Sequence, residues 1–262
     1  MTAPADSCRE ANARAERWSG VPSGWRRVSA EEEEQARSRT IDDIQAASTL
    51  EGLQCVERAL APASTHPIRL LALWPSIGPF SSGDLLVIQL LGHAVSLETC
   101  LAIAGDDGAH VRTIARYLRA LPIDRAACMA DADTLIAMDD LWSALFEALR
   151  SGGAAPADAE TAAHRLCARK APMLFPASNQ TFDDVTGAED SRHRAWQLHR
   201  YLDGDAEIRG AVANLVCAAQ DYDRSLGHRL SGMWTLPIID LCTTVDLPAT
   251  GNARGHRVRQ LG

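Results

Sequence analysis

Apolar residues recur along this chain mainly at helical spacing. Between residues 206 and 221, for example, Ile208, Val212 and Leu215 lie three or four positions apart, as residues on the buried face of a helix do. A weaker stripe predicts another helix over 41–60. Similar patterns predict helices over 109–120, 132–150, 157–170, 191–202 and 236–245. No run alternates as a strand does, and aromatic residues make up only 5% of the chain, so we expect an all-α fold.

Capping residues and prolines indicate where these helices begin and end. Ser29 precedes an acidic run, Glu31–Glu34, which suits the first turn of a helix. Ser81-Ser82-Gly83-Asp84 has the spacing of a capping box, and it predicts one apolar, buried helix over 85–104. The segment 66–79 holds three prolines, so we expect an extended connector there.

We expect one helical domain over residues 29–250. Residues 1–28 show little periodicity and predict a loosely held arm, although Trp18 and Trp25 suggest that part of it docks on the domain. Residues 251–262 carry three arginines and no acid, which is typical of a disordered basic tail.

The net charge and the spacing of the cysteines limit the partners and cofactors that we expect. A net charge of −8 opposes the counterion release that drives nucleic-acid binding, so we do not expect a nucleic-acid partner. The seven cysteines include no CxxC pair, and we expect neither a disulfide framework nor a metal, nor any other cofactor. Polar residues interrupt the apolar stretch 85–104, and no signal peptide is visible, so we expect a cytoplasmic protein without a membrane span.

One region resembles a known family. Its motifs are the Trp-containing stretch Leu141–Leu149, the block Ala162–Pro172 with its Ala-Arg-Lys-Ala-Pro sequence, and Leu174–Pro176. They resemble an uncharacterised, mainly actinobacterial domain-of-unknown-function family, whose order of motifs is similar to that of the helix-hairpin-helix DNA glycosylases. The resemblance runs from about Phe80 to Val245, and it implies a glycosylase-like helical domain.

The chain departs from that pattern at the residues that carry glycosylase chemistry. In those enzymes the backbone amides of the hairpin hold a DNA phosphate, but here Arg150–Asp158 lacks the Gly-x-Gly spacing and implies a degraded hairpin. The position of the catalytic Asp falls on Asn179, whose amide neither accepts a proton nor supplies negative charge. Asp183 or Asp184 would have to take that place; the alternative is that both simply flank a surface helix. We therefore do not expect base excision.

Other candidate residues allow two interpretations each. Lys170 is the only lysine of the chain, and it is either a Schiff-base nucleophile or an ordinary hydrogen-bonding lysine beside Arg169. His193, Trp196 and His199 lie near one another on one predicted helix. They form either a stacking platform for a flat ligand or part of the core.

Two functions remain as hypotheses. The first is a small-molecule-binding protein, an enzyme of bacterial specialised metabolism, that reuses a glycosylase-like scaffold. Its catalytic candidates are Asp183, Asp184 and Lys170, and its ligand-binding candidates are Asn179, Arg169, His193, Trp196 and His199. The second is a non-catalytic DNA-binding or base-recognition module of the helix-hairpin-helix type, which would need a basic face.

Overall fold

The structure is a computed structural model that describes residues 20–72, 76, 78–106, 108–177 and 191–247. Within these ranges the chain forms twelve α-helices and one 3₁₀ turn and no strand, which confirms the all-α prediction. Among the described helices, none is long and apolar enough to span a membrane.

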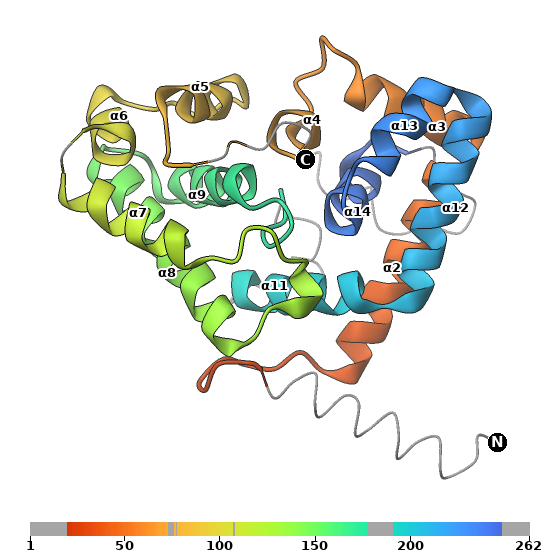
Figure 1. Ribbon diagram of the computed structural model, residues 1–262, viewed down its shortest axis with the longest axis horizontal. Coiled ribbons are helices and arrows are strands. Elements are labelled where there is room, and N and C mark those ends of the chain that lie inside the picture. The colour runs from red at the N-terminus through yellow and green to blue at the C-terminus, as the bar shows by residue number, and fades with distance from the viewer. Residues whose placement is uncertain (1–19, 73–75, 77, 107, 178–190, 248–262) are drawn as a thin grey trace, which may run out of the picture.

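The helices fall into two groups, one on each side of Figure 1. In the left group α8 packs against α7 and α9, and α6 packs against α7 and α8. This group consists of α5 (Ser82–Leu90), α6 (Leu97–Ala104), α7 (Ala109–Ala120), α8 (Ala132–Ser151) and α9 (Pro156–Lys170). In the right group α12 packs against α2, α3 and α13. Its members are α2 (Ala30–Ala47), α3 (Leu50–Leu60), α12 (Ala206–Tyr222) and α13 (Arg224–Ser231).

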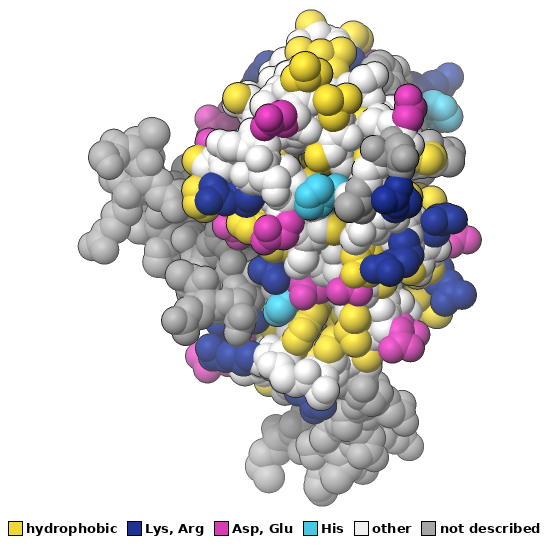
Figure 2. All heavy atoms as spheres, turned by 90° about the vertical axis from the view of Figure 1, so that its left-hand side faces the viewer, with side chains coloured by type: hydrophobic (Ala, Val, Ile, Leu, Met, Phe, Trp, Pro, Cys, Tyr) yellow, Lys and Arg dark blue, Asp and Glu magenta, His cyan; other side chains and the backbone are white. Residues whose placement is uncertain are grey.

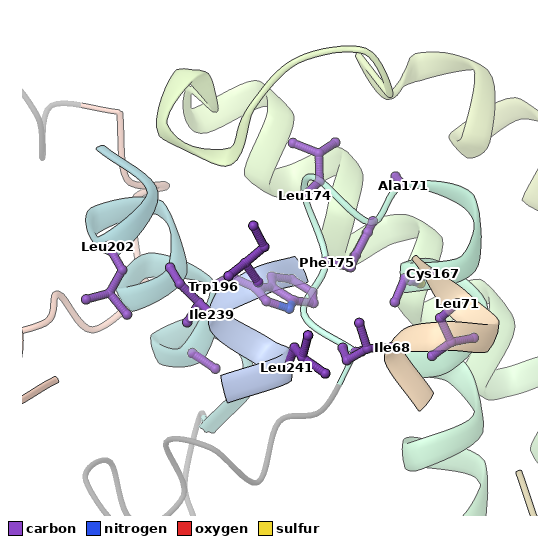
Figure 3. Packing of buried hydrophobic residues seen from close by; sticks show 14 of the residues in the cluster. Ile68, Leu71, Cys167, Ala171, Leu174, Phe175, Trp196, Leu202, Ile239 and Leu241 are labelled. Carbon is purple, nitrogen blue, oxygen red and sulfur yellow. The ribbon is translucent and has the colours of Figure 1, made fainter. Parts of the chain in front are cut away.

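Three helices join the two groups. They are α4 (Pro67–Leu71), α11 (Ser191–Gly204) and α14 (Thr235–Thr244). The first, α4, packs against both α9 and α14, while α11 packs against α2, α12, α14 and the 3₁₀ turn η1 (Ala127–Met129). One hydrophobic cluster runs through all of them. At its centre Trp196 of α11 meets Phe175 edge-on, with ring centroids 5.6 Å apart (Figure 3).

Several predicted helices needed correction because a short-range signal interrupts them. The helix expected over 41–60 belongs to two elements, since α2 ends at Ala47 and Thr49 caps α3 by accepting a hydrogen bond from the Gly52 amide. A side chain at Gly52 would collide with the Ala46 carbonyl. That glycine therefore lets α3 start tightly against the end of α2.

The segment 85–104 is not one buried helix. It breaks at Gly92, whose φ of 90° is a left-handed value that favours glycine, and Ser96 caps a new helix, α6. The proline-rich connector 66–79 is also not wholly extended, because Pro67 starts α4 at the helical position where a missing N–H costs nothing. The predicted capping signals at Ser29 and Ser81 are both present.

One helix, α13, was missed by the sequence analysis. It has eight residues, and its buried apolar side chains are only Leu226 and Leu230, too few to produce a clear period. Asp223 ends α12 and caps α13, while Gly227 allows close contact with Gln220 of α12. The tight packing between these two helices defines α13 more than its own pattern does.

Candidate functional site

The end of α9 carries two basic residues that meet a buried carboxylate. Lys170 Nζ lies 2.8 Å from Asp84 Oδ2, and Arg169 Nε lies 3.0 Å from Asp84 Oδ1. Asp84 lies in the first turn of α5, where Ser81 also donates its amide and its hydroxyl to Oδ2. We call Asp84, Arg169 and Lys170 the ionic cluster. It joins the capping box of α5 to the C-terminal end of α9.

All three N–H groups of the Lys170 ammonium have partners. Besides Asp84, it donates to Ser76 Oγ at 2.8 Å and to the Pro79 carbonyl at 2.9 Å. Burial lowers the pKa of Lys170, and the hydrogen bond to Asp84 opposes that effect. Burial alone would raise the pKa of Asp84, but Lys170 and the Ser81 amide bring it below its usual value.

This geometry bears on the proposed nucleophile. A lysine nucleophile needs a free lone pair that the substrate can reach, whereas the Lys170 side chain is buried and its donors are engaged. Arg169 is held similarly, since it also donates to the Leu70 carbonyl of α4 at 2.6 Å. Both residues therefore fit the alternative of a structural, hydrogen-bonding role.

A second cluster surrounds α11 and is mainly aromatic. We define this aromatic cluster as Trp25, Trp142, His164, His193 and Trp196. His193 stacks on Trp25, with centroids 3.7 Å apart and planes 11° apart, and Trp196 lies 5.9 Å from His193. Trp25 reaches α11 because residues 20–28 dock there: Gln197 accepts from the Val28 amide and donates to the Arg26 carbonyl. Trp18 lies outside the described residues.

Asp139 of α8 fixes the polar edge of the aromatic cluster. His193 Nε2 lies 2.9 Å from Asp139 Oδ1, and Arg192 pairs with the same oxygen at 2.9 Å. Burial would raise the pKa of Asp139, but His193 and Arg192 lower it overall. The Arg192 guanidinium also lies over the Trp142 ring at 4.1 Å. His193 is thus enclosed between protein groups.

The interior of the aromatic cluster is neutral. His164 is buried 5.4 Å from Trp142, and burial, followed by the charges of Arg192 and His199, lowers its pKa to about 3. The indole nitrogens of Trp142 and Trp196 are buried and have no hydrogen-bond partner among the described residues. Packing, rather than hydrogen bonding of the indole nitrogens, therefore holds the two tryptophan rings in place.

His199, the third predicted platform residue, is fully buried. Its Nδ1 lies 2.8 Å from the Ala195 carbonyl and its Nε2 lies 3.3 Å from Asp240 Oδ1. The other carboxylate oxygen of Asp240 accepts a hydrogen bond from the Ala177 amide at 2.6 Å. The pair therefore ties α11 and α14 to the segment that follows α9.

The turn between α8 and α9 contains the segment in which the sequence resemblance implied a degraded hairpin. Its amides bond internally: Gly153 N donates to the Arg150 carbonyl at 3.0 Å and Ala154 N to the Leu149 carbonyl at 3.2 Å. This is a Schellman cap, and Gly153 has the positive φ of 90° that such a cap requires. A side chain at Gly152 would collide with Thr99 of α6. Both glycines therefore have structural roles.

A cavity of about 370 Å³ lies beside the end of α9. The segment after α9, the connection from α13 to α14 and the segment after α7 all contribute residues to its lining. The lining includes Pro172, Met173, Met233, Trp234, Ile123 and Asp124. Trp234 is 55% exposed. Among the described lining residues the ionisable ones are Asp124 and Lys170, and the Lys170 side chain is itself buried.

Comparison with known proteins places the chain in a family. A family of unknown function, DUF6308, matches residues 75–224, which is more than half of the chain. The chain belongs to the DUF6308 family. Neither the curated proteins nor the solved structures contain a match. The DUF6308 segment includes the ionic cluster and one wall of the cavity, whereas Met233 and Trp234 of the other wall follow it.

The predicted site residues that the structure of this DUF6308 protein describes lie in separate places. Arg169 and Lys170 face α4 and α5, while His193, Trp196 and His199 lie on α11 with different partners. Asn179, Asp183 and Asp184 lie outside the described residues.

Sequence reasoning missed the residues that surround the cavity. Met173, Met233 and Trp234 belong to short connections, and none carries a recognisable catalytic motif. The one available signal was Trp234, a large apolar residue outside any helical stripe. Asp84 was recognised only as a capping residue, because its two basic partners lie far away in sequence.

Proposed function

We propose that this protein binds a small, largely apolar molecule in the cavity beside the end of α9. The observation that carries the proposal is the exposed indole of Trp234 on the edge of an apolar cavity of about 370 Å³. Small-molecule sites are typically apolar cavities of about 300–1,000 Å³ with few polar groups. An indole beside such a cavity offers a flat apolar face against which a ligand ring can pack.

The lining indicates the chemistry of the ligand. Met173 and Met233 are flexible and polarisable, so they adapt to varied apolar shapes, and Trp234 offers a flat face for a ring. Asp124 would favour a ligand with a hydroxyl or an amine at one end. Lys170 contributes little charge, because its ammonium is already bound to Asp84, Ser76 and Pro79. We infer a neutral or weakly basic ligand with an aromatic or aliphatic ring.

The alternative function, DNA binding through a hairpin, has less support. The amides of Gly153 and Ala154 are engaged in the cap of α8, so they do not point to an external phosphate. The net charge of −8 also opposes duplex binding. We retain the glycosylase-like scaffold and a role in specialised metabolism as parts of the proposal. The scaffold is supported by the succession of α8, a short turn and α9. The metabolic role is motivated by the acidic net charge and by the departures from the glycosylase pattern.

Thermal unfolding in the presence of a panel of ring-containing apolar fragments tests this function. A ligand at about 100 times its Kd should stabilise the fold by about 2.7 kcal/mol, which corresponds to a Tm increase of roughly 5–10 °C. The variant Trp234→Ala should lose most of this increase, because it removes the exposed rim of the cavity while leaving the core intact.

The matched control is Met129→Ala. Met129 is exposed like Trp234 but does not line the cavity, so this variant should respond to fragments as the unmodified chain does. If no fragment raises the Tm, or if Trp234→Ala responds fully, the proposed site is wrong. The variant Asp124→Asn should selectively weaken the binding of fragments that contain an amine.

A further inference from the structure

Two short helices expose an unusual amount of apolar surface. Leu86 and Leu90 of α5 and Leu97 and Leu101 of α6 are between 55% and 75% exposed. Each pair is four residues apart, so its members lie on the same side of their helix. Partly buried Val87, Leu91 and Val95 adjoin them. We call the four leucines the leucine face.

The two helices that carry the leucine face contain few charged residues of their own. Between residues 82 and 104 the ionisable groups other than Cys100 are Asp84, His93 and Glu98. Asp84 is buried in the ionic cluster, and His93 lies 2.6 Å from an Arg165 nitrogen. Glu98 is the one exposed charged side chain in this described range. Figure 2 shows hydrophobic side chains gathered at the top of the molecule, where α5 and α6 lie.

We propose that the leucine face is the interface of a two-fold homodimer. Two copies of a chain with a net charge of −8 repel each other over most of their surfaces, and a charge-poor face is where they can approach. The face is also self-complementary, since two adjacent helices each present a leucine pair. A two-fold axis would pack α5 of one copy against α6 of the other, which is the isologous contact that most homodimers use.

The size of the leucine face indicates how tightly the two copies should associate. Specific interfaces bury about 1,200–2,000 Å² in total, and two helices of nine and eight residues supply only the apolar centre of a contact at the lower end of that range. The dimer should therefore dissociate in the micromolar range rather than form an obligate assembly.

Sedimentation velocity over a wide range of protein concentrations tests the dimer. The unmodified chain should approach twice its mass of 28.2 kDa as its concentration increases. Added salt should strengthen the association, because it screens the repulsion between like-charged copies. The double variant Leu97→Glu/Leu101→Glu should weaken the association at least about 30-fold, which is the effect of losing one central contact residue.

The matched control is Leu50→Glu. Leu50 is 63% exposed at the start of α3, and Figure 1 shows α3 on the opposite side of the molecule from α5 and α6. Its substitution should leave the dimer unchanged. The proposal is overturned if the unmodified chain stays monomeric at every concentration, if salt dissociates the dimer, or if Leu50→Glu disrupts it equally. A monomer that binds uncharged lipid vesicles through the leucine face would likewise overturn it.

Discussion

The ionic cluster and the aromatic cluster both contain residues predicted to form a functional site, but these residues are held in opposite ways. In the ionic cluster the Lys170 ammonium has three partners, and both oxygens of Asp84 accept hydrogen bonds. In the aromatic cluster two indole N–H groups have no partner among the described residues, and His164 is neutral at physiological pH. The ionic cluster depends on the pairing of its charges, whereas the interior of the aromatic cluster depends on packing.

This difference shows why residue type alone left two interpretations open for each region. A lone lysine and a histidine–tryptophan group have the chemistry of functional sites, yet partners on distant elements engage them. Buried charges are costly unless they are paired. Substitutions in the ionic cluster should therefore strongly lower the stability of the fold. Substitutions that preserve shape in the aromatic cluster should lower stability only slightly.

The largest expected effect is that of Lys170→Met. This variant keeps most of the side-chain volume but leaves Asp84 buried with one charged partner fewer, at a cost of about 3–5 kcal/mol. The midpoint of thermal unfolding should fall by roughly 6–20 °C, as measured by calorimetry. The double variant Lys170→Met/Asp84→Asn should lose less stability than the sum of the single variants. Strict additivity would show that the pair is not coupled.

A change of pH should have an intermediate effect on the stability of the fold. His164 in the unfolded chain binds a proton below its ordinary pKa of 6.5, whereas the folded protein takes it up only near pH 3. The unfolded state therefore binds more protons between these values, and stability should decrease as the pH is lowered through this window. The loss should reach about 2 kcal/mol near pH 5, at about 1.4 kcal/mol per pH unit.

Urea unfolding between about pH 7 and pH 5 measures this dependence and stays above the ordinary pKa values of the carboxylates. His164→Leu should flatten the curve, since it removes the titrating group. His228 is exposed on α13, and His228→Gln should leave the slope unchanged. An unaltered slope in His164→Leu would assign the pH dependence to other groups.

The smallest effect should come from Trp142→Phe. The indole N–H of Trp142 has no described partner, so its removal sacrifices no hydrogen bond, and the remaining ring can still stack on Phe146, 5.1 Å away. We expect less than about 1.5 kcal/mol of destabilisation in chemical denaturation, within the range of shape-tolerant core substitutions. A loss as large as that of Lys170→Met would contradict the contrast between the two clusters.

The sequence by itself determined the all-α class, most of the helices and the caps at Ser29 and Ser81, because these depend on period and on interactions within a few residues. It did not reveal the break at Gly92 or helix α13, where close contact and backbone conformation outweigh a weak apolar pattern.

Tertiary structure alone decided which polar groups meet. Asp84 and Lys170 are 86 positions apart, as their numbers show, and His199 pairs with Asp240 across two helices. No local pattern encodes such pairs, since their geometry arises from the packing of whole helices. The same holds for the cavity, which segments from four parts of the chain enclose, and for the exposure of the leucines on α5 and α6. Local periodicity marks a residue as apolar, but only the surrounding helices determine whether it is covered.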